Sequence, residues 1–166
     1  MYELKRLHRD AVPAALEKAR RYRLLNEALE AESICLDILA VDPDNAEALV
    51  DLVLALSDQF ERKLGEKFEQ ALALLPRFRS EYERLYYEGI LCERRAKVSL
   101  GQGGPGSGSV AYTWFRQAME RFEAAEALRP EGNDDAILRW NTCARILNRN
   151  ALVVPAHEDD SAPMLE

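Results

Sequence analysis

The chain has 166 residues, of which 48% are hydrophobic, and a formal net charge of −7 at pH 7. A chain of this length can bury about two thirds of its unfolded surface, so one domain without disulfide or metal staples is expected. The negative charge argues against a nucleic-acid partner held through its phosphates. The sequence lacks both a secretory signal and an apolar run near the roughly 18 residues of a membrane span, which predicts a soluble cytoplasmic protein without a membrane partner.

Residues 11–41 are predicted to form a pair of helices. Pro13 suits the first turn of a helix and Asp10 suits its N-cap. Asn26 interrupts the apolar pattern, which then resumes at helical spacing. Pro43 ends the second helix, because the residue before a proline is disfavoured in helical geometry. Helices joined by about two residues must lie antiparallel.

A second pair is predicted over residues 44–75. Its first helix carries apolar residues on two faces as far as Phe60. A helix of this kind contacts two neighbours, as the helices of a stacked array do. A shorter partner helix covers residues 63–75 and stops at Pro76.

Residues 79–129 are predicted to form a third, longer pair, interrupted by a Gly-rich linker at residues 101–109 that we expect to be mobile. Gly89 lies on the apolar stripe of the first helix, where it costs about 1 kcal/mol relative to alanine. We therefore expect a neighbouring helix to approach too closely for a side chain there. A closing helix is predicted over residues 134–149, followed by a flexible acidic tail at residues 150–166.

Two segments 87 residues apart share the same spacing of small and apolar residues before a proline. The intervals of four, three and five residues separate Ala31, Cys35, Ile38 and Pro43, and again Ala118, Phe122, Ala125 and Pro130. The residues that follow the two prolines are also alike. This internal period predicts a repeat protein.

These helix pairs, each ending at a proline, resemble the tetratricopeptide repeat. The resemblance extends with gaps over residues 11–149 and is strongest from Asn26 to Leu49. It implies an all-α fold of about seven helices, in which antiparallel pairs stack as a short right-handed superhelix.

The resemblance also implies a concave groove, lined by the first helix of each pair, that holds an extended or helical peptide. On this chain the groove residues are Leu16, Arg20, Arg23, Glu47, Val50, Leu54, Tyr86, Ile90, Arg94, Leu138 and Arg145. Arg20, Arg94 and Arg145 are the best candidates, because planar guanidinium groups suit carboxylates, and they favour an acidic peptide or protein partner. Chaperone-binding members of the family grip a terminal carboxylate with lysine and asparagine, but Leu16 and Arg20 stand in the matching places.

The leading hypothesis is a protein-interaction adaptor, and the alternative is a self-associating structural or regulatory subunit of a larger complex. Catalysis is not expected, because His8 and His157 lie near the ends of the sequence and no nucleophile, base and acid fall on neighbouring elements. No cofactor or metal is expected. Residues 18–23 interleave four basic residues with Tyr22, which leaves RNA or DNA binding as a less favoured third hypothesis.

Cysteines and charges give two further expectations. Cys35, Cys92 and Cys143 occupy apolar helical positions and are predicted to be reduced core residues. Residues 1–25 carry 7 Lys and Arg against 3 Asp and Glu, whereas residues 26–75 carry 3 against 12. These charges either attract one another within the fold or form a groove with one basic and one acidic wall.

Overall fold

The computed structural model describes residues 1–151 and 153–156, and over these residues it is all-helical. The predicted all-α class is therefore confirmed. Seven α-helices are found: α1 (Val12–Leu24), α2 (Ala28–Val41), α3 (Ala46–Ser57), α4 (Phe60–Leu74), α5 (Glu81–Gln102), α6 (Ser107–Ala127) and α7 (Asp135–Arg149). Short 3-10 turns precede α1 at Arg9–Ala11 and follow α4 at Leu75–Arg77.

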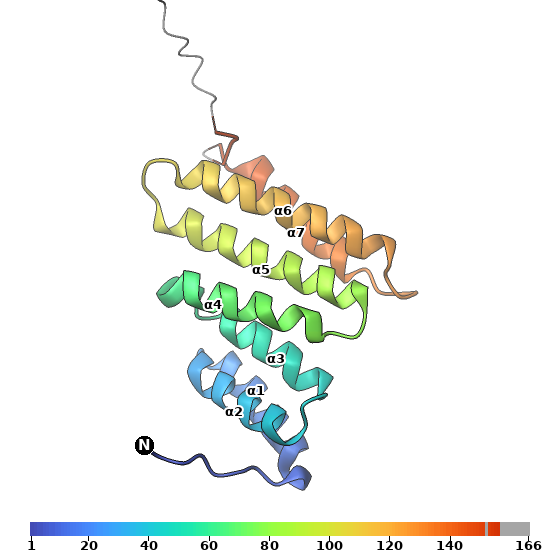
Figure 1. The fold of residues 1–166 in the computed structure, drawn as a ribbon. Helices are drawn as coiled ribbons and strands as arrows, with labels where there is room; N and C mark the ends of the chain where they lie inside the picture. Colours follow the sequence, from blue (N-terminus) through green and yellow to red (C-terminus); the bar gives the residue numbers. More distant parts are fainter. Residues whose placement is uncertain (152, 157–166) are drawn as a thin grey trace, which may run out of the picture.

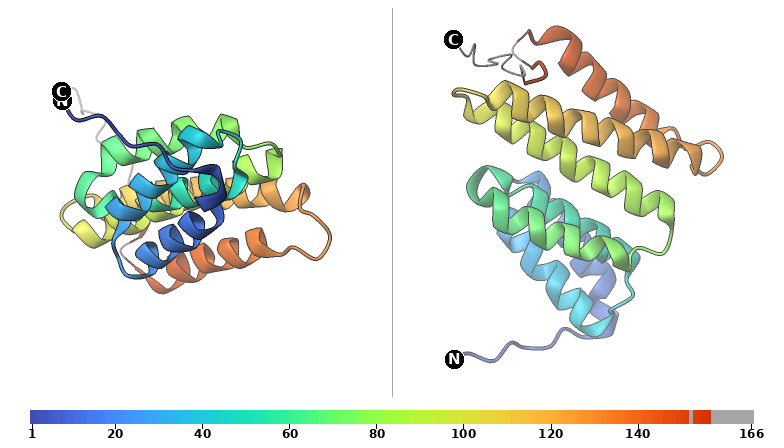
Figure 2. Two further views of the ribbon diagram at one scale, coloured as in Figure 1. Left: turned by 90° about the horizontal axis from the view of Figure 1, so that it is seen from below. Right: turned by 45° about the horizontal axis from the view of Figure 1, so that its top comes forward.

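The helices follow one another along the molecule in chain order, from α1 and α2 at one end to α6 and α7 at the other (Figure 1). Each helix packs against the next, and contacts also join α1 to α3, α3 to α5, and α5 to α7. The odd-numbered helices, which are the predicted first helices of the pairs, thus lie beside one another. Figure 2 shows this succession from two further directions.

Local sequence signals explain most helix starts. The Asn45 side chain accepts the Ala48 N–H at 2.9 Å and caps α3, as Ser80 caps α5 by accepting the Glu83 N–H at 3.1 Å. Asn133 accepts the Asp135 N–H at 2.9 Å before α7. Pro13 lies in the first turn of α1 as predicted, but no side-chain cap bond comes from Asp10, because α1 follows directly on a 3-10 turn that contains it.

The start of α4 differs from the prediction. Phe60 begins α4 rather than continuing α3, because α3 ends at Ser57 and only a two-residue turn intervenes. Lys63 has a non-helical backbone, with φ −144° and ψ 57°, so α4 is kinked one turn after it starts. Its regular part begins close to the predicted residue 63.

The predicted Gly-rich linker at 101–109 is mostly helical. α5 continues through Gln102 and α6 begins at Ser107, so only residues 103–106 lie outside a helix. Gly103, Gly104 and Gly106 adopt positive φ values there and reverse the chain. α5 and α6 pack along their lengths, and this tertiary packing extends both helices into residues that are poor helix formers.

The buried side chains form two clusters. The N-terminal core is built mainly from α1 to α4, with Leu91 of α5 and Phe78 before it, and includes Cys35, Ile38 and Phe60. The C-terminal core is built from α5 to α7 and includes Phe115 and Phe122. All three cysteines are buried and unbridged, as predicted, and burial raises the pKa of each thiol to about 12.

Residues 150–156 belong to the predicted tail, and one of them packs against the fold. Val153 is buried in the C-terminal core, and its N–H donates to the Asn150 carbonyl at 3.1 Å. The expectation of an unpacked tail is therefore wrong for Val153, which supplies an apolar side chain at the end of α7. Residue 152 and residues 157–166 of the predicted tail lie outside the described residues. Within the described part of the chain, no helix has the length and apolar character needed to cross a membrane.

Candidate protein-binding surfaces

The arginines of α1 are held by carboxylates of α3. Arg20 Nε lies 2.9 Å from Asp51 Oδ2, and its Nη2 lies 2.5 Å from Glu47 Oε2. Arg23 Nε lies 2.8 Å from Asp58 Oδ2. The basic N-terminal segment and the acidic segment that follows it therefore meet within the fold, which favours mutual attraction over a groove with two charged walls.

Ion pairs also join the other odd-numbered helices. Arg94 of α5 pairs with Asp58, the residue that follows α3, and donates to Ser57 Oγ at 2.6 Å. Glu93 of α5 pairs with Lys97 of the same helix, and Arg139 of α7 lies 3.4 Å away from its Oε1. Every junction between odd-numbered helices thus contains at least one ion pair, and these pairs favour the stacked arrangement.

Glu93 is the more deeply buried of the carboxylates in these junctions. Its side chain is 1% exposed, and its Oε2 atom has no hydrogen-bond partner among the described residues. Asp51 is also buried, and burial raises its pKa although Arg20 opposes the shift. In both places a buried carboxylate depends on an arginine from the neighbouring odd-numbered helix.

Two predicted groove residues lie in the core instead. Leu16 is 7% exposed and belongs to the N-terminal core, and Ile90 is 2% exposed and belongs to the C-terminal core. The prediction that they line a groove is wrong, because their helices turn these positions toward the neighbouring helices. Val50, Leu54 and Tyr86 are partly buried against the same two cores.

The last two predicted groove residues lie on the exposed side of α7. Leu138 is 62% exposed, and Arg145 is also exposed. Thr142, Arg145, Ile146, Arg149 and Asn150 line a hollow of about 500 Å³. Arg145 and Arg149 form no ion pair with any residue that the structure describes, in contrast to Arg20, Arg23 and Arg94.

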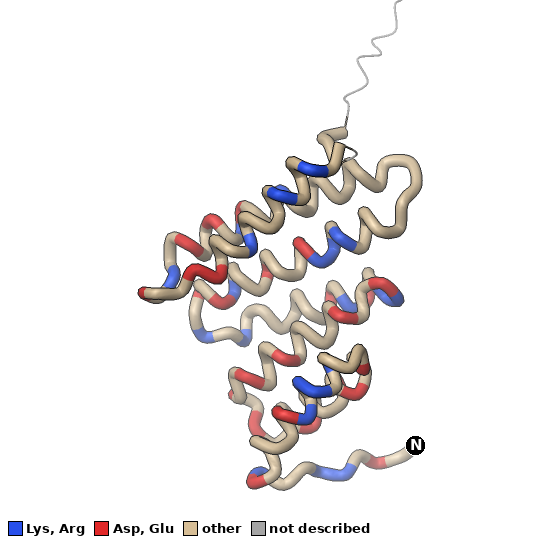
Figure 3. Tube along the Cα trace, turned by 180° about the vertical axis from the view of Figure 1, so that it is seen from behind, with Lys and Arg blue, Asp and Glu red and all other residues tan. Residues whose placement is uncertain are grey.

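We call Leu138, Thr142, Arg145, Ile146 and Arg149 the α7 surface. Leu138, Thr142, Arg145 and Arg149 follow one another at steps of four, three and four residues, so they form one stripe along the helix. In Figure 3, α1 and α7 lie toward the viewer and both carry Lys or Arg along their length. The difference between them is that the α1 arginines discussed above have acidic partners on α3.

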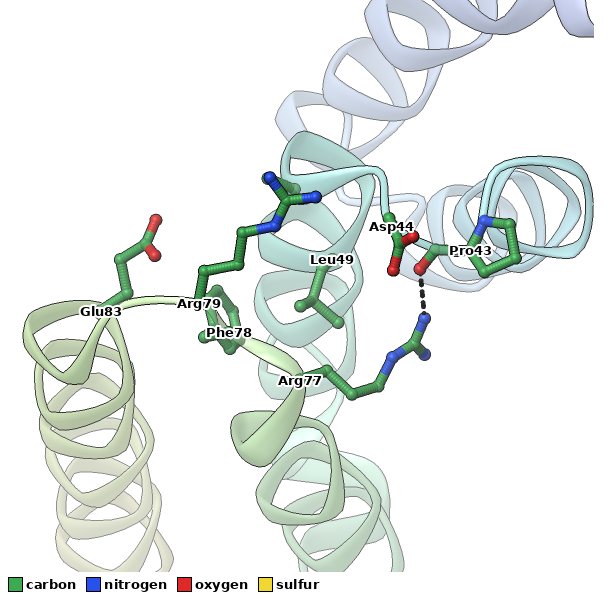
Figure 4. A pocket seen from close by; sticks show the side chains of 8 residues that line it. Pro43, Asp44, Leu49, Arg77, Phe78, Arg79 and Glu83 are labelled. Carbon is green, nitrogen blue, oxygen red and sulfur yellow. Dashed lines mark hydrogen bonds between the residues drawn. The ribbon is translucent and has the colours of Figure 1, made fainter.

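A separate pocket of about 300 Å³ lies where the α2–α3 turn meets the segment between α4 and α5. Figure 4 shows Arg77 and Arg79 at this pocket together with the carboxylates of Asp44 and Glu83, around the side chains of Leu49 and Phe78. Arg77 donates to the Pro43 carbonyl at 2.7 Å and so ties the two segments together. Sequence periodicity gave no signal for this pocket, because it forms only where two inter-helix segments meet the starts of α3 and α5.

The described residues contain no group of three His, Cys, Asp or Glu side chains placed to hold a metal ion. The thiols, Tyr82, Tyr86 and Tyr87 all have raised pKa values, and burial is the largest cause for each. These shifts follow from packing in the two cores.

Comparisons with models of known families, with curated proteins and with solved structures find no match to this chain. The resemblance to the tetratricopeptide repeat therefore stays a prediction drawn from the sequence.

Proposed function

We propose that this protein is an interaction module that binds an acidic segment of a partner protein on the α7 surface. The observation that carries the proposal is the pair Arg145 and Arg149, which are exposed beside a hollow and lack an ion pair within the described residues. The proposal includes a tetratricopeptide-like adaptor role in the cytoplasm, without catalysis. The contacts between successive odd-numbered helices support that arrangement, for which we also propose the right-handed superhelical stacking of the family.

The chemistry of the α7 surface suits a segment with both carboxylates and an apolar side chain. Arg145 and Arg149 are one helical turn apart, so two carboxylates of one segment can pair with them. Leu138 and Ile146 offer apolar contact beside the guanidinium groups. Because the ion pairs lie at the surface, binding should weaken as salt concentration rises.

The other two favoured arginines are less suited to this role. A ligand carboxylate at Arg20 must displace Glu47 or Asp51, and one at Arg94 must displace Asp58. Such a ligand gains only the difference between two similar interactions, whereas a ligand at Arg145 gains a whole ion pair. This difference favours the α7 surface over the predicted groove.

Selection from a random peptide library tests the proposal. The full chain is immobilised, bound peptides are sequenced, and their affinities are measured by fluorescence anisotropy at 50 and 300 mM salt. We expect peptides rich in Asp and Glu with at least one aliphatic residue, and an affinity loss of tenfold or more in the variant Arg145→Glu plus Arg149→Glu.

The control is Arg62→Glu plus Arg116→Glu, which reverses two exposed arginines on α4 and α6 and changes net charge equally. This variant should bind the same peptides as the wild type. Selected peptides that bind all three proteins equally would refute the proposal. Binding found only after deletion of residues 157–166, which contain three consecutive acidic residues, would assign the α7 surface to this chain's own C-terminal segment and also refute it.

A further inference from the structure

We infer that the acidic partner of the α7 surface is a second copy of this chain, which docks the exposed side of its α2 there. The inference rests on the proposed function of the α7 surface and names its partner. It is carried by an exposed strip on α2 whose composition is complementary to that of α7.

The exposed side of α2 combines leucines with carboxylates. Leu29 is 59% exposed and Leu36 is 52% exposed, and the exposed carboxylates of Glu27 and Glu30 lie beside Leu29. The two leucines are seven residues apart, or about two helical turns, so they lie on one side of the helix. We call Glu27, which directly precedes α2, together with Leu29, Glu30 and Leu36 the α2 surface. Exposed leucines at this spacing are typical of a helix face that packs against another helix.

The charges of α2 and α7 are opposite. α2 contains three carboxylates and no Lys or Arg, whereas α7 contains three arginines and one aspartate. One charge of each helix is paired within the molecule: Glu32 of α2 with Lys67 at 2.9 Å, and Arg139 of α7 with Glu93 at 3.4 Å. Asp37 is half-buried, so the α2 surface presents the carboxylates of Glu27 and Glu30, and the α7 surface presents two arginines.

The spacings on the two helices also agree. If α2 and α7 of two copies pack antiparallel with Leu138 level with Leu36, Arg145 lies seven residues further along and is level with Leu29 and Glu30. Arg149 then lies one turn beyond, near Glu27. In this alignment Leu138 meets Leu36, Leu29 lies beside Ile146, and Arg145 and Arg149 lie near Glu30 and Glu27.

The positions of the two surfaces determine the form of the assembly. α2 lies at the N-terminal end of the molecule and α7 at its C-terminal end (Figure 1). A contact between the α2 surface of one copy and the α7 surface of another leaves one unused surface of each kind. Such a head-to-tail contact adds further copies as concentration rises, whereas a contact between identical surfaces stops at a dimer.

Sedimentation velocity of the full chain over a hundredfold range of concentration tests the inference. Two charge-reversal variants are used: Arg145→Glu plus Arg149→Glu, and Glu27→Lys plus Glu30→Lys. The first variant carries acid on both surfaces and the second carries base on both. We expect the wild type to associate, and each variant alone to associate at least tenfold more weakly, because like charges then face each other.

An equimolar mixture of the two variants should recover association, since every contact between unlike copies again joins acid to base. The variant Arg62→Glu plus Arg116→Glu should associate as the wild type does. A single monomeric species at all concentrations, association that neither reversal weakens, or no recovery on mixing would each overturn the inference. If the chain stays monomeric but peptides bind at the α7 surface, this inference alone is overturned. If the chain stays monomeric and no peptide binds there, the proposed function is overturned as well.

Discussion

The arginines at the ends of α1 and α7 are used differently. In α1 to α4, Arg20 and Arg23 pair with carboxylates of α3 and of the residue that follows it, so these two arginines are engaged within the fold. In α5 to α7, Arg145 and Arg149 extend from the last helix without an ion pair among the described residues. Arg20 and Arg23 therefore contribute to stacking, whereas Arg145 and Arg149 are available for binding.

The halves also differ in how closely their helices approach. A Cβ atom built on Gly89 would lie 2.5 Å from Phe122 Cε1, which is too short for a real contact, so α5 and α6 meet without a side chain at this position. Gly65 of α4 has no neighbouring atom within 4 Å of such a Cβ atom. The same substitution at these two helical glycines should therefore change stability in opposite directions.

The largest predicted effect is that of Gly89→Ala. Its clash with Phe122 should outweigh the better helix propensity of alanine and lower the free energy of unfolding by about 1–3 kcal/mol. Gly65→Ala should raise it by roughly 0.5–1 kcal/mol, because only the propensity gain applies there. Urea denaturation followed by circular dichroism measures both.

A double-mutant cycle with Phe122→Leu identifies the cause. The smaller side chain at residue 122 should reduce the loss caused by Gly89→Ala, so the two substitutions should be less harmful together than their sum. Strict additivity would show that Phe122 is not what excludes the methyl group. A destabilising effect of Gly65→Ala equal to that of Gly89→Ala would contradict the difference in packing between the halves.

The fold could be predicted from the sequence where local signals, such as prolines, helix caps and apolar periodicity, are strong. Pro43 and Asn45 mark the boundary between α2 and α3, and the apolar period places all seven helices. The close approach at Gly89 was also predictable, because an unfavourable glycine inside a helix needs a compensating contact. The prediction that residues 101–109 form a linker was wrong at both ends, since the long contact between α5 and α6 overrides the poor helix propensity of Gly101 and Gly108.

The candidate binding residues were harder to predict. Arg20, Arg94 and Arg145 have the same chemistry in the sequence, and only the structure shows that the first two face carboxylates on α3. Helix periodicity shows which face of a helix is apolar, but it does not show which neighbouring helix covers each position of that face. It therefore could not separate Leu16, which lies in the core, from an exposed groove position. Ion pairing between segments about 30 residues apart has no local signal.

The second predicted effect concerns the pKa of Asp51, which burial raises and Arg20 lowers. Burial dominates and raises the pKa of Asp51 above its ordinary value of 3.8. The folded protein therefore binds a proton at the Asp51 carboxyl more strongly than the unfolded chain does. The stability that protonated Asp51 contributes is present below pH 3.8 and is lost as the pH rises through its folded pKa. Asp51→Asn removes this titration and retains a hydrogen-bond acceptor for Arg20.

Unfolding of both proteins in urea between pH 3 and 7 tests this prediction. The stability of the wild type relative to Asp51→Asn should fall as the pH rises through the raised pKa of Asp51. A relative stability that rises with pH would mean that the ion pair with Arg20 outweighs the desolvation of the carboxylate. In that case the N-terminal half would gain net stability from its internal charge pairing.

The smallest predicted effects separate the arginines that stabilise the fold from those available for binding. Arg94→Met removes the bonds from the guanidinium to Asp58 and Ser57, and because the side chain is partly exposed the loss should be only about 0.5–1 kcal/mol. Arg145→Met keeps a similar length of side chain and breaks no described ion pair, so its unfolding free energy should stay within about 0.5 kcal/mol of the wild type.

Replicate denaturation curves of both variants, in 50 and 300 mM salt, are needed to resolve the two effects. The Arg94 effect should shrink at the higher salt concentration and the Arg145 variant should not change, because only the first substitution removes an attraction within the molecule. Equal losses for the two variants would place Arg145 among the stabilising residues and remove the contrast between paired and unpaired arginines from which the binding surface was inferred.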